Sequence, residues 1–367
     1  MLQWVFGMSV SVRRDLLMLF LGFVLIIGVP SGTWAAKVDN LYQQEIMVSS
    51  QGEQERLEAE GQGLSNVIIK VTGLRSVLGL PDIRDAVRNP ASYLQSYSYR
   101  RENGERTGRQ YLQMQFNPTL VNRLLRESNV AIWGSNRPTT LMWLAVDNQG
   151  SRQILGSNAN LSKVMEGHFN TRGIPAILPL QDFEDARNIS AVDVWGGFTE
   201  RLESASRRYG AEAIISGRLR KSGERYTGRI TLLFQEQRFH ADVEDMVASG
   251  VASVASELAA KHLASHYAVA ATDINEKPLL VVSNVNSVED YAALTTYLEK
   301  LTAVREVSVH KVRGGTIELA LSIDGSVVQL KDALALGRQL SAGLPPVKNA
   351  EGALTASAHL YYRWNRR

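Results

Sequence analysis

Two histidines placed four residues apart are the first candidates for chemistry in this sequence. His262 and His266 lie in a predicted helix, and residues four apart on a helix share one face. Two imidazoles in this arrangement can bind one divalent metal ion. A zinc-protease motif needs a glutamate directly after the first histidine, but leucine follows His262, and Leu258 offers no third ligand one turn earlier. Two interpretations follow, a metal site and a surface pair stabilised by the dipole at a helix end, and we favour the second.

Serine and glycine motifs do not form a catalytic pattern. The Gly-x-Ser-x-Gly pattern of many hydrolases does not occur. One Ser-x-x-Lys pair occurs, Ser308 and Lys311, but it lies in a predicted strand, where residues three apart point to opposite faces. The Gly-x-Gly at residues 61–63 lacks the third glycine of a dinucleotide fingerprint and falls inside a predicted helix. We therefore predict no catalytic residue, no cofactor and no nucleotide ligand, and hence that the protein is not an enzyme.

Three carboxylates lie close together in a polar segment, at Asp182, Glu184 and Asp185. Carboxylates at this spacing could serve acid–base chemistry or hold calcium. The segment lacks the glycine and the distal glutamate of an EF-hand loop. We therefore favour a solvated loop that binds no ligand.

Four tyrosines, Tyr93, Tyr97, Tyr99 and Tyr111, accompany a predicted hairpin that turns at Asn-Gly, residues 103–104. Aromatic rings present flat apolar faces, so the group is a candidate surface for stacking on sugars. A half-exposed sheet face produces the same alternation of tyrosines with polar residues. We favour the sheet face and keep the sugar surface as its alternative.

Composition limits the classes to which the chain can belong. Its 367 residues are 44% hydrophobic and 21% charged, with no cysteine and a formal net charge of +3. That length predicts two or three globular domains. The absence of cysteine excludes disulfides, thiolate nucleophiles, cysteine-ligated metals and lipid anchors on cysteine. The arginine doublets at 100–101, 207–208 and 366–367 are widely separated, so no concentrated basic face indicates a nucleic-acid partner.

The first 35 residues have the pattern of an export signal. Arg13 and Arg14 precede an apolar run over residues 16–29, and small residues follow up to Ala35. The run is shorter than the roughly 20 residues of a membrane-spanning helix. We predict cleavage after Ala35 and a soluble protein in the periplasm. If the segment is not cleaved, it would anchor the chain in the inner membrane, which is the one route to membrane contact.

Three α/β units are predicted to follow the signal, over residues 36–136, 137–270 and 278–367, with a linker near 270–277. Each combines helices whose apolar residues recur every three or four positions with strands of alternating pattern. In the middle unit we predict helices over 161–171, 195–209 and 243–266. The last unit reads strand, helix, hairpin, helix, strand, which is the ferredoxin-like βαββαβ order. The fold class is therefore α/β (α+β).

The middle unit resembles a periplasmic α/β module. Residues 209–212, Tyr-Gly-Ala-Glu, are followed by Ile-Ile-Ser-Gly at 214–217, then a turn and a strand. This run is similar to the core of the amino-terminal domain of the Tol translocation protein B and of the lipoproteins that activate penicillin-binding proteins. The resemblance covers residues 141–266 and implies protein–protein contacts and envelope assembly. The lipoproteins are anchored through a cysteine that this chain lacks.

The mature chain also resembles a bacterial family of exported proteins with a domain of unknown function. The residues that carry this resemblance are Val-Ser-Ser-Gln at 48–51, Val-Thr-Gly at 71–73 and Tyr-Ser-Tyr at 97–99. The family has no established activity, so the resemblance implies no functional residue.

We therefore expect a non-catalytic interaction or envelope-assembly accessory protein in the periplasm. Its partner would be an envelope protein or peptidoglycan, not a nucleic acid or a nucleotide. The alternative is a periplasmic enzyme, or a binder of a small ligand or metal, whose site is dispersed along the sequence.

Overall fold

The computed structural model describes residues 36–102, 109–270, 277–343 and 359–365. Helices combine with three larger sheets and one two-stranded pair, formed by β1 (Ala36–Lys37) and β5 (Asn136–Arg137). The predicted α+β class is therefore confirmed. The predicted signal at 1–35 and most of the predicted linker lie outside the described residues. Among the described residues, no helix has both the length and the apolar character needed to cross a membrane.

The first sheet has three antiparallel strands in the order β2-β4-β3. The strands are β2 (Gln43–Val48), β3 (Leu94–Arg101) and β4 (Gln110–Phe116), and the helices are α2 (Glu53–Thr72), α3 (Pro81–Arg88) and α4 (Pro118–Glu127). Two short 3-10 helices, η1 (Ser76–Gly79) and η2 (Pro90–Tyr93), flank α3.

Helix α2 covers one face of this sheet. Leu64 and Ile68 are fully buried in one core with Leu112 and Phe116 of β4. Gly63 allows the close approach, because a Cβ there would lie 2.7 Å from the Met114 methyl carbon. Asn117 accepts hydrogen bonds from the first amides of α4 and caps that helix.

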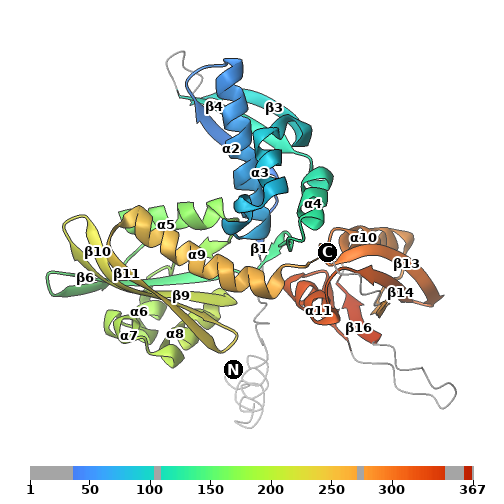
Figure 1. Ribbon diagram of the computed structural model, residues 1–367. Helices are drawn as coiled ribbons and strands as arrows, with labels where there is room; N and C mark the ends of the chain where they lie inside the picture. The colour runs from blue at the N-terminus through green and yellow to red at the C-terminus, as the bar shows by residue number, and fades with distance from the viewer. Residues whose placement is uncertain (1–35, 103–108, 271–276, 344–358, 366–367) are drawn as a thin grey trace, which may run out of the picture. The chain divides into compact units, whose positions relative to one another are not determined.

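The middle sheet has the order β11-β10-β9-β6-β7, with β8 paired to β6 beside β7. Its strands are β6 (Thr140–Asn148), β7 (Ser151–Ile154), β8 (Ala176–Ile177), β9 (Ala213–Ser222), β10 (Arg225–Phe234) and β11 (Gln237–Val247). Figure 1 shows α5 (Asn160–Thr171) and α9 (Ala248–Tyr267) on one face. The other face carries α6 (Phe183–Asn188), α7 (Ala191–Gly196) and α8 (Thr199–Ser206).

Two predicted helices of the middle unit are wrong in extent. The helix predicted over 195–209 is broken, because Gly197 adopts a left-handed conformation (φ 66°) that ends α7 before α8 begins. The helix predicted over 243–266 begins at Ala248, and residues 237–247 form β11 instead. Strand β11 pairs along its length with β10, a partner that the helical spacing of Val243, Val247 and Val251 does not reveal.

The third sheet has the order β13-β14-β12-β16-β15. Its strands are β12 (Leu279–Ser283), β13 (Val304–Arg313), β14 (Thr316–Ile323), β15 (Leu340–Ala342) and β16 (His359–Trp364), and α10 (Val288–Glu299) and α11 (Val327–Leu336) complete the unit. Up to α11 the unit follows the predicted βαββαβ order. Before the last strand, β16, it departs from the ferredoxin-like arrangement, which is antiparallel throughout, by one inserted short strand, β15. That strand pairs antiparallel with β16, which runs parallel to β12.

Arg137 is a fully buried cation at the junction between the first and middle sheets. Its guanidinium lies 4.2 Å from the centre of the Trp133 ring. Among the described residues its hydrogen-bond acceptors are all backbone oxygens, those of Lys70 (2.6 Å), Trp133 (2.8 Å), Gly134 (2.9 Å), Arg172 (3.0 Å) and Gly173 (3.0 Å). The oxygens of Lys70 and Arg172 lie at the ends of α2 and α5, where carbonyls lack partners within the helix. Arg137 therefore caps two helices at once.

Candidate functional site

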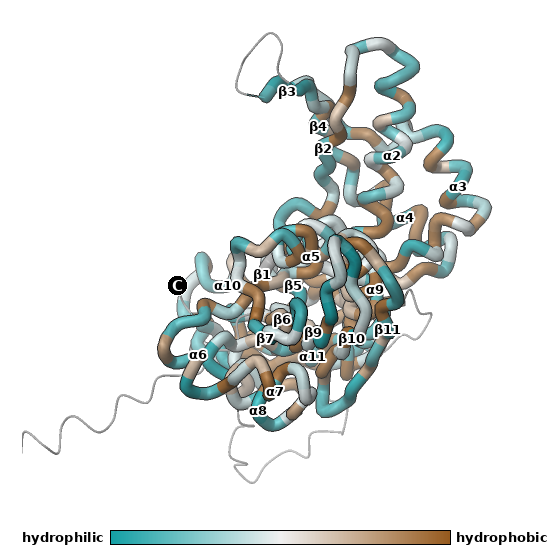
Figure 2. The backbone as a smooth tube through the Cα atoms, turned by 90° about the vertical axis from the view of Figure 1, so that its left-hand side faces the viewer, coloured by the Kyte–Doolittle hydropathy of each residue, from teal (hydrophilic) through white to brown (hydrophobic). Residues whose placement is uncertain are grey.

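The face of the first sheet opposite α2 is lined by polar side chains. Strand residues alternate between the two faces of a sheet, so the residues that lie between the buried positions all project to this side. Three rows cross the strands β2, β4 and β3: Gln43, Gln115 and Ser96; Glu45, Gln113 and Ser98; Met47, Tyr111 and Arg100. Figure 2 shows β2 and β3 largely in hydrophilic colours. We call this surface the open sheet face.

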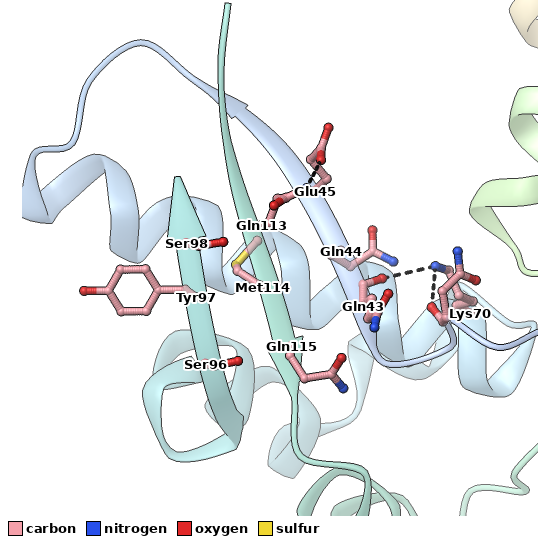
Figure 3. Close-up of a pocket in the computed structure, with 11 residues that line it drawn as sticks. Gln43, Gln44, Glu45, Lys70, Ser96, Tyr97, Ser98, Gln113, Met114 and Gln115 are labelled. Carbon is pink, nitrogen blue, oxygen red and sulfur yellow. Dashed lines mark hydrogen bonds between the residues drawn. The ribbon is translucent and has the colours of Figure 1, made fainter. Parts of the chain in front are cut away.

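A hollow of about 510 Å³ lies against the open sheet face. Amide and hydroxyl groups predominate in its lining, which consists of Asn40, Gln43, Gln44, Glu45, Lys70, Ser96, Tyr97, Ser98, Gln113, Met114 and Gln115. Figure 3 shows the side chains of Ser96, Ser98 and Gln115 together on this side of the strands. Most of these groups are uncharged hydrogen-bond donors and acceptors.

The carboxylate in the hollow is already paired. Glu45 accepts two hydrogen bonds from Arg100 (2.5 and 3.3 Å) and one from Gln113 (2.8 Å). The hydrogen bond from Arg100 is the main cause that lowers the pKa of Glu45. The Arg100 guanidinium also lies over the Tyr111 ring, 4.8 Å from its centre. One network thus links the three strands and fixes the Tyr111 ring.

Lys70 is the one cation in the lining, and its side chain is held by the backbone. Its Nζ donates to the carbonyl oxygens of Asn40 and Gln43, both at 3.2 Å, as Figure 3 shows. The residue is only 6% exposed. Burial, with a smaller contribution from the charge of Arg137, lowers the pKa of Lys70 to about 8.

The four tyrosines do not form one stacking surface. Tyr111 lies on the open sheet face, whereas Tyr97 and Tyr99 alternate to the opposite face. Tyr97 and Tyr99 meet edge to face at 6.1 Å, and Arg56 lies over the Tyr97 ring. Figure 3 shows the Tyr97 ring directed away from Gln115 and Lys70. Tyr93 packs against the core of the first sheet. Of the four tyrosines, Tyr111 alone therefore lies on the open sheet face, next to Gln113 and outside the lining of the hollow.

His262 and His266 both lie on α9 and have different partners. The His262 ring stacks on Phe239, with centres 3.6 Å apart. His266 Nε2 lies 3.1 Å from a carboxylate oxygen of Asp332 on α11 and 2.8 Å from Gln235 Nε2. No cluster of three or more metal-ligating side chains was found in the part of the chain that the structure describes. The favoured interpretation, a surface pair at a helix end, and its alternative, a metal site, both stay predictions.

The segment with three carboxylates was predicted as a solvated loop; Asp182 and Glu184 are exposed, but the segment forms α6 and Asp185 is buried. Asp182 caps α6, and Asp185 is only 2% exposed. Both carboxylate oxygens of Asp185 are occupied: one accepts from Arg208 (3.2 Å), and the other accepts from the Tyr209 hydroxyl (2.5 Å) and the Gln181 amide (2.8 Å). Burial of Asp185 follows from α6 packing beside α8, a contact between segments that the local sequence does not indicate.

The Ser308–Lys311 pair departs from its predicted geometry. A register shift in β13 between Val309 and Lys311 places Ser308 opposite Ala320 and Lys311 opposite Glu318. The two side chains therefore share a face, whereas an unbroken strand would separate them. The Ser308 hydroxyl donates to the Ala320 carbonyl oxygen at 3.2 Å, so its proton is held by the backbone.

Sequence reasoning missed the open sheet face as a site. The signal was present as glutamines at alternate positions, Gln113 and Gln115 in β4, facing away from Leu112 and Met114. Single polar residues opposite a core are common on exposed sheets. Only the cross-strand register shows that three strands place such residues side by side.

Residues 35–134, which include the open sheet face, match a family model described as a domain of unknown function (DUF8605). The expected likeness to proteins with such a domain is confirmed to that extent. No curated protein and no solved structure matches the chain.

Proposed function

We propose that this protein is a non-catalytic envelope-assembly accessory protein of the periplasm that holds a peptidoglycan strand on its open sheet face. The observation that carries the proposal is the ladder of amide and hydroxyl groups across β2, β4 and β3. The export signal predicted at residues 1–35 would bring the protein to the periplasm, where peptidoglycan occurs.

The chemistry of the lining suits a polar ligand that carries little charge. Glutamine and serine side chains both donate and accept hydrogen bonds, as sugar hydroxyls and acetamido groups require. Glu45 is paired with Arg100, and the Lys70 ammonium donates to two carbonyl oxygens, so both charged groups already have hydrogen-bond partners. Tyr111 is fixed by Arg100 and can present its apolar ring to a sugar.

An envelope protein is the alternative partner. Strands β2 and β3 are the outer strands of the sheet, and an outer strand can accept an added strand from another chain. Such a partner would bind through backbone hydrogen bonds, so replacing the Gln113 and Gln115 side chains would have little effect on it.

The test is co-sedimentation of the mature protein with purified peptidoglycan sacculi. We expect the double variant Gln113→Ala/Gln115→Ala to bind about thirtyfold more weakly, since two hydrogen bonds of roughly 1 kcal/mol each are lost. Gln153→Ala, an exposed glutamine on β7, is the matched control and should bind like the parent chain. No sedimentation of the parent chain, or equal binding by the double variant, would contradict the proposal.

The proposed compartment has its own measurement. Processing at the predicted site would leave Ala36 as the first residue of protein recovered from the periplasmic fraction. Intact-mass spectrometry of that fraction measures this directly. Recovery of the full-length chain from the membrane fraction would favour the uncleaved anchor, and recovery from the cytoplasm would contradict export.

A further inference from the structure

A second surface of interest lies on the middle sheet, away from the open sheet face. Helices α7 and α8 cover the part of that sheet formed by β6 and β9, where Trp143 and Ile214 join Leu202 in a core. Beyond these helices, β10 and β11 carry polar and charged side chains on the same face.

The strand register gathers these side chains into a grid. Three rows cross β9, β10 and β11: Arg218, Arg229 and Asp242; Ser216, Thr231 and His240; Ile214, Leu233 and Arg238. The first two rows are polar or charged throughout, and the third brings Arg238 beside them. The cations come from three different strands and surround Thr231.

A groove of about 270 Å³ follows this grid, between the sheet and the region where α8 begins. Its lining includes three arginines and one histidine, Arg218, Arg229, Arg238 and His240, and the part of the chain that the structure describes contributes no aspartate or glutamate to it. Of the arginines, Arg229 donates to Asp242 at the rim (2.7 Å) and Arg238 to the Thr199 hydroxyl (3.4 Å). We call this surface the basic groove.

The arrangement of charges in the basic groove is unfavourable without an anion. Arg218 lies directly opposite Arg229, and like charges facing each other on neighbouring strands destabilise a sheet. Asp242 offsets part of this repulsion, mainly through its hydrogen bond from Arg229 and less through the charges of His240 and Arg218. The remaining positive charge faces the groove.

A buried hydroxyl adds a donor at the same place. Ser216 lines the groove and is only 5% exposed. Its hydroxyl can donate a hydrogen bond to an oxygen in the groove. Thr231, its cross-strand neighbour, supplies a second hydroxyl beside it.

We propose that the basic groove binds a phosphate group carried by a ligand. Guanidinium groups form paired, charge-assisted hydrogen bonds with phosphate oxygens. A phosphate presents several oxygens and a double charge, which matches cations arriving from three strands with hydroxyls between them. A soluble phosphate ester and a phospholipid headgroup both present the negatively charged oxygens that the arginines of the basic groove bind. Either of them can therefore supply the phosphate.

The test uses inorganic phosphate as the probe and follows backbone amide shifts of the mature protein by NMR at constant ionic strength. We expect saturable shifts at residues of β9, β10 and β11. Arg218→Gln/Arg238→Gln should weaken the fitted affinity at least tenfold, because two charge-assisted contacts are removed. Ser216→Ala should weaken it severalfold. Arg84→Gln, which removes an exposed charge from α3, is the matched control.

Vesicles distinguish the two sources of phosphate. Co-flotation with phosphatidic acid vesicles but not with phosphatidylcholine vesicles, lost in the double arginine variant, would assign a lipid phosphate. Phosphate-dependent shifts without co-flotation would assign a soluble ester. Shifts that chloride reproduces at equal ionic strength, or that the double arginine variant retains, would overturn the proposal. The phosphate and vesicle results do not bear on peptidoglycan binding, since Gln113 and Gln115 lie on a different sheet.

Discussion

Replacing Arg137 by methionine should destabilise the protein by roughly 3–5 kcal/mol, the range for removing one partner of a buried charged network. Five backbone oxygens, including those at the ends of α2 and α5, would lose their donor in a place that water does not reach. Each unsatisfied buried polar group costs about 1–3 kcal/mol, part of which local relaxation recovers. Burial lowers the pKa of Arg137 to about 9, so the guanidinium keeps its proton at neutral pH.

Urea denaturation followed by circular dichroism would measure this loss. Arg84→Met, which removes an exposed arginine of α3, should change the free energy of unfolding by less than about 0.5 kcal/mol. Arg137→Lys is a second informative variant, because an ammonium has three donors and cannot reproduce the planar fork. It should recover only part of the stability. A change below about 1 kcal/mol in Arg137→Met would show that the five oxygens find other donors.

Raising the pH from 7.5 to 9.5 should stabilise the parent chain relative to Lys70→Met by up to about 2 kcal/mol. The pKa of Lys70 is lowered to about 8 in the folded protein, below its usual value near 10.4 in an unfolded chain. Between these values the unfolded chain binds more protons than the folded one, so the free energy of unfolding rises with pH. The destabilisation of the folded protein by the buried Lys70 charge is fully present below pH 8 and disappears as the pH rises above that value.

The measurement is the urea midpoint of both chains across this range. Buried tyrosines act in the opposite direction at higher pH, because burial raises the pKa of Tyr297 and Tyr267. The comparison therefore stops at pH 9.5 and uses the difference between the two chains. Parallel pH profiles for parent and variant would show that the two carbonyls around Nζ offset the burial of the charge.

Local patterns predicted much of the secondary structure correctly. The apolar spacing of Leu64, Ile68 and Val71 places α2 on its sheet, and the hairpin of β3 and β4 matches its alternating residues. These elements are predictable because each depends on its own residues and on one core. Strand β11 was missed because valines four apart mimic a helix, although Phe239, Ala241 and Val243 also alternate.

The candidate site depended on relations that no single segment contains. Asp185 was expected in solvent, but Arg208 and Tyr209 enclose it from later in the chain. Arg137 was expected at a boundary between domains, where nothing in the adjacent residues indicates burial. A side chain's exposure is set by what packs against it, and these contacts join residues far apart in sequence.

By itself, the sequence determined the α+β class, most of the helices and hairpins, and the exclusion of chemistry that needs cysteine. Periodicity and composition carry that information because backbone geometry repeats along the chain. Only the tertiary structure decided which polar residues lie together: the amides of the open sheet face, the arginines of the basic groove and the carbonyls around Arg137. Cross-strand register and helix packing set those neighbours, and both arise from long-range contacts.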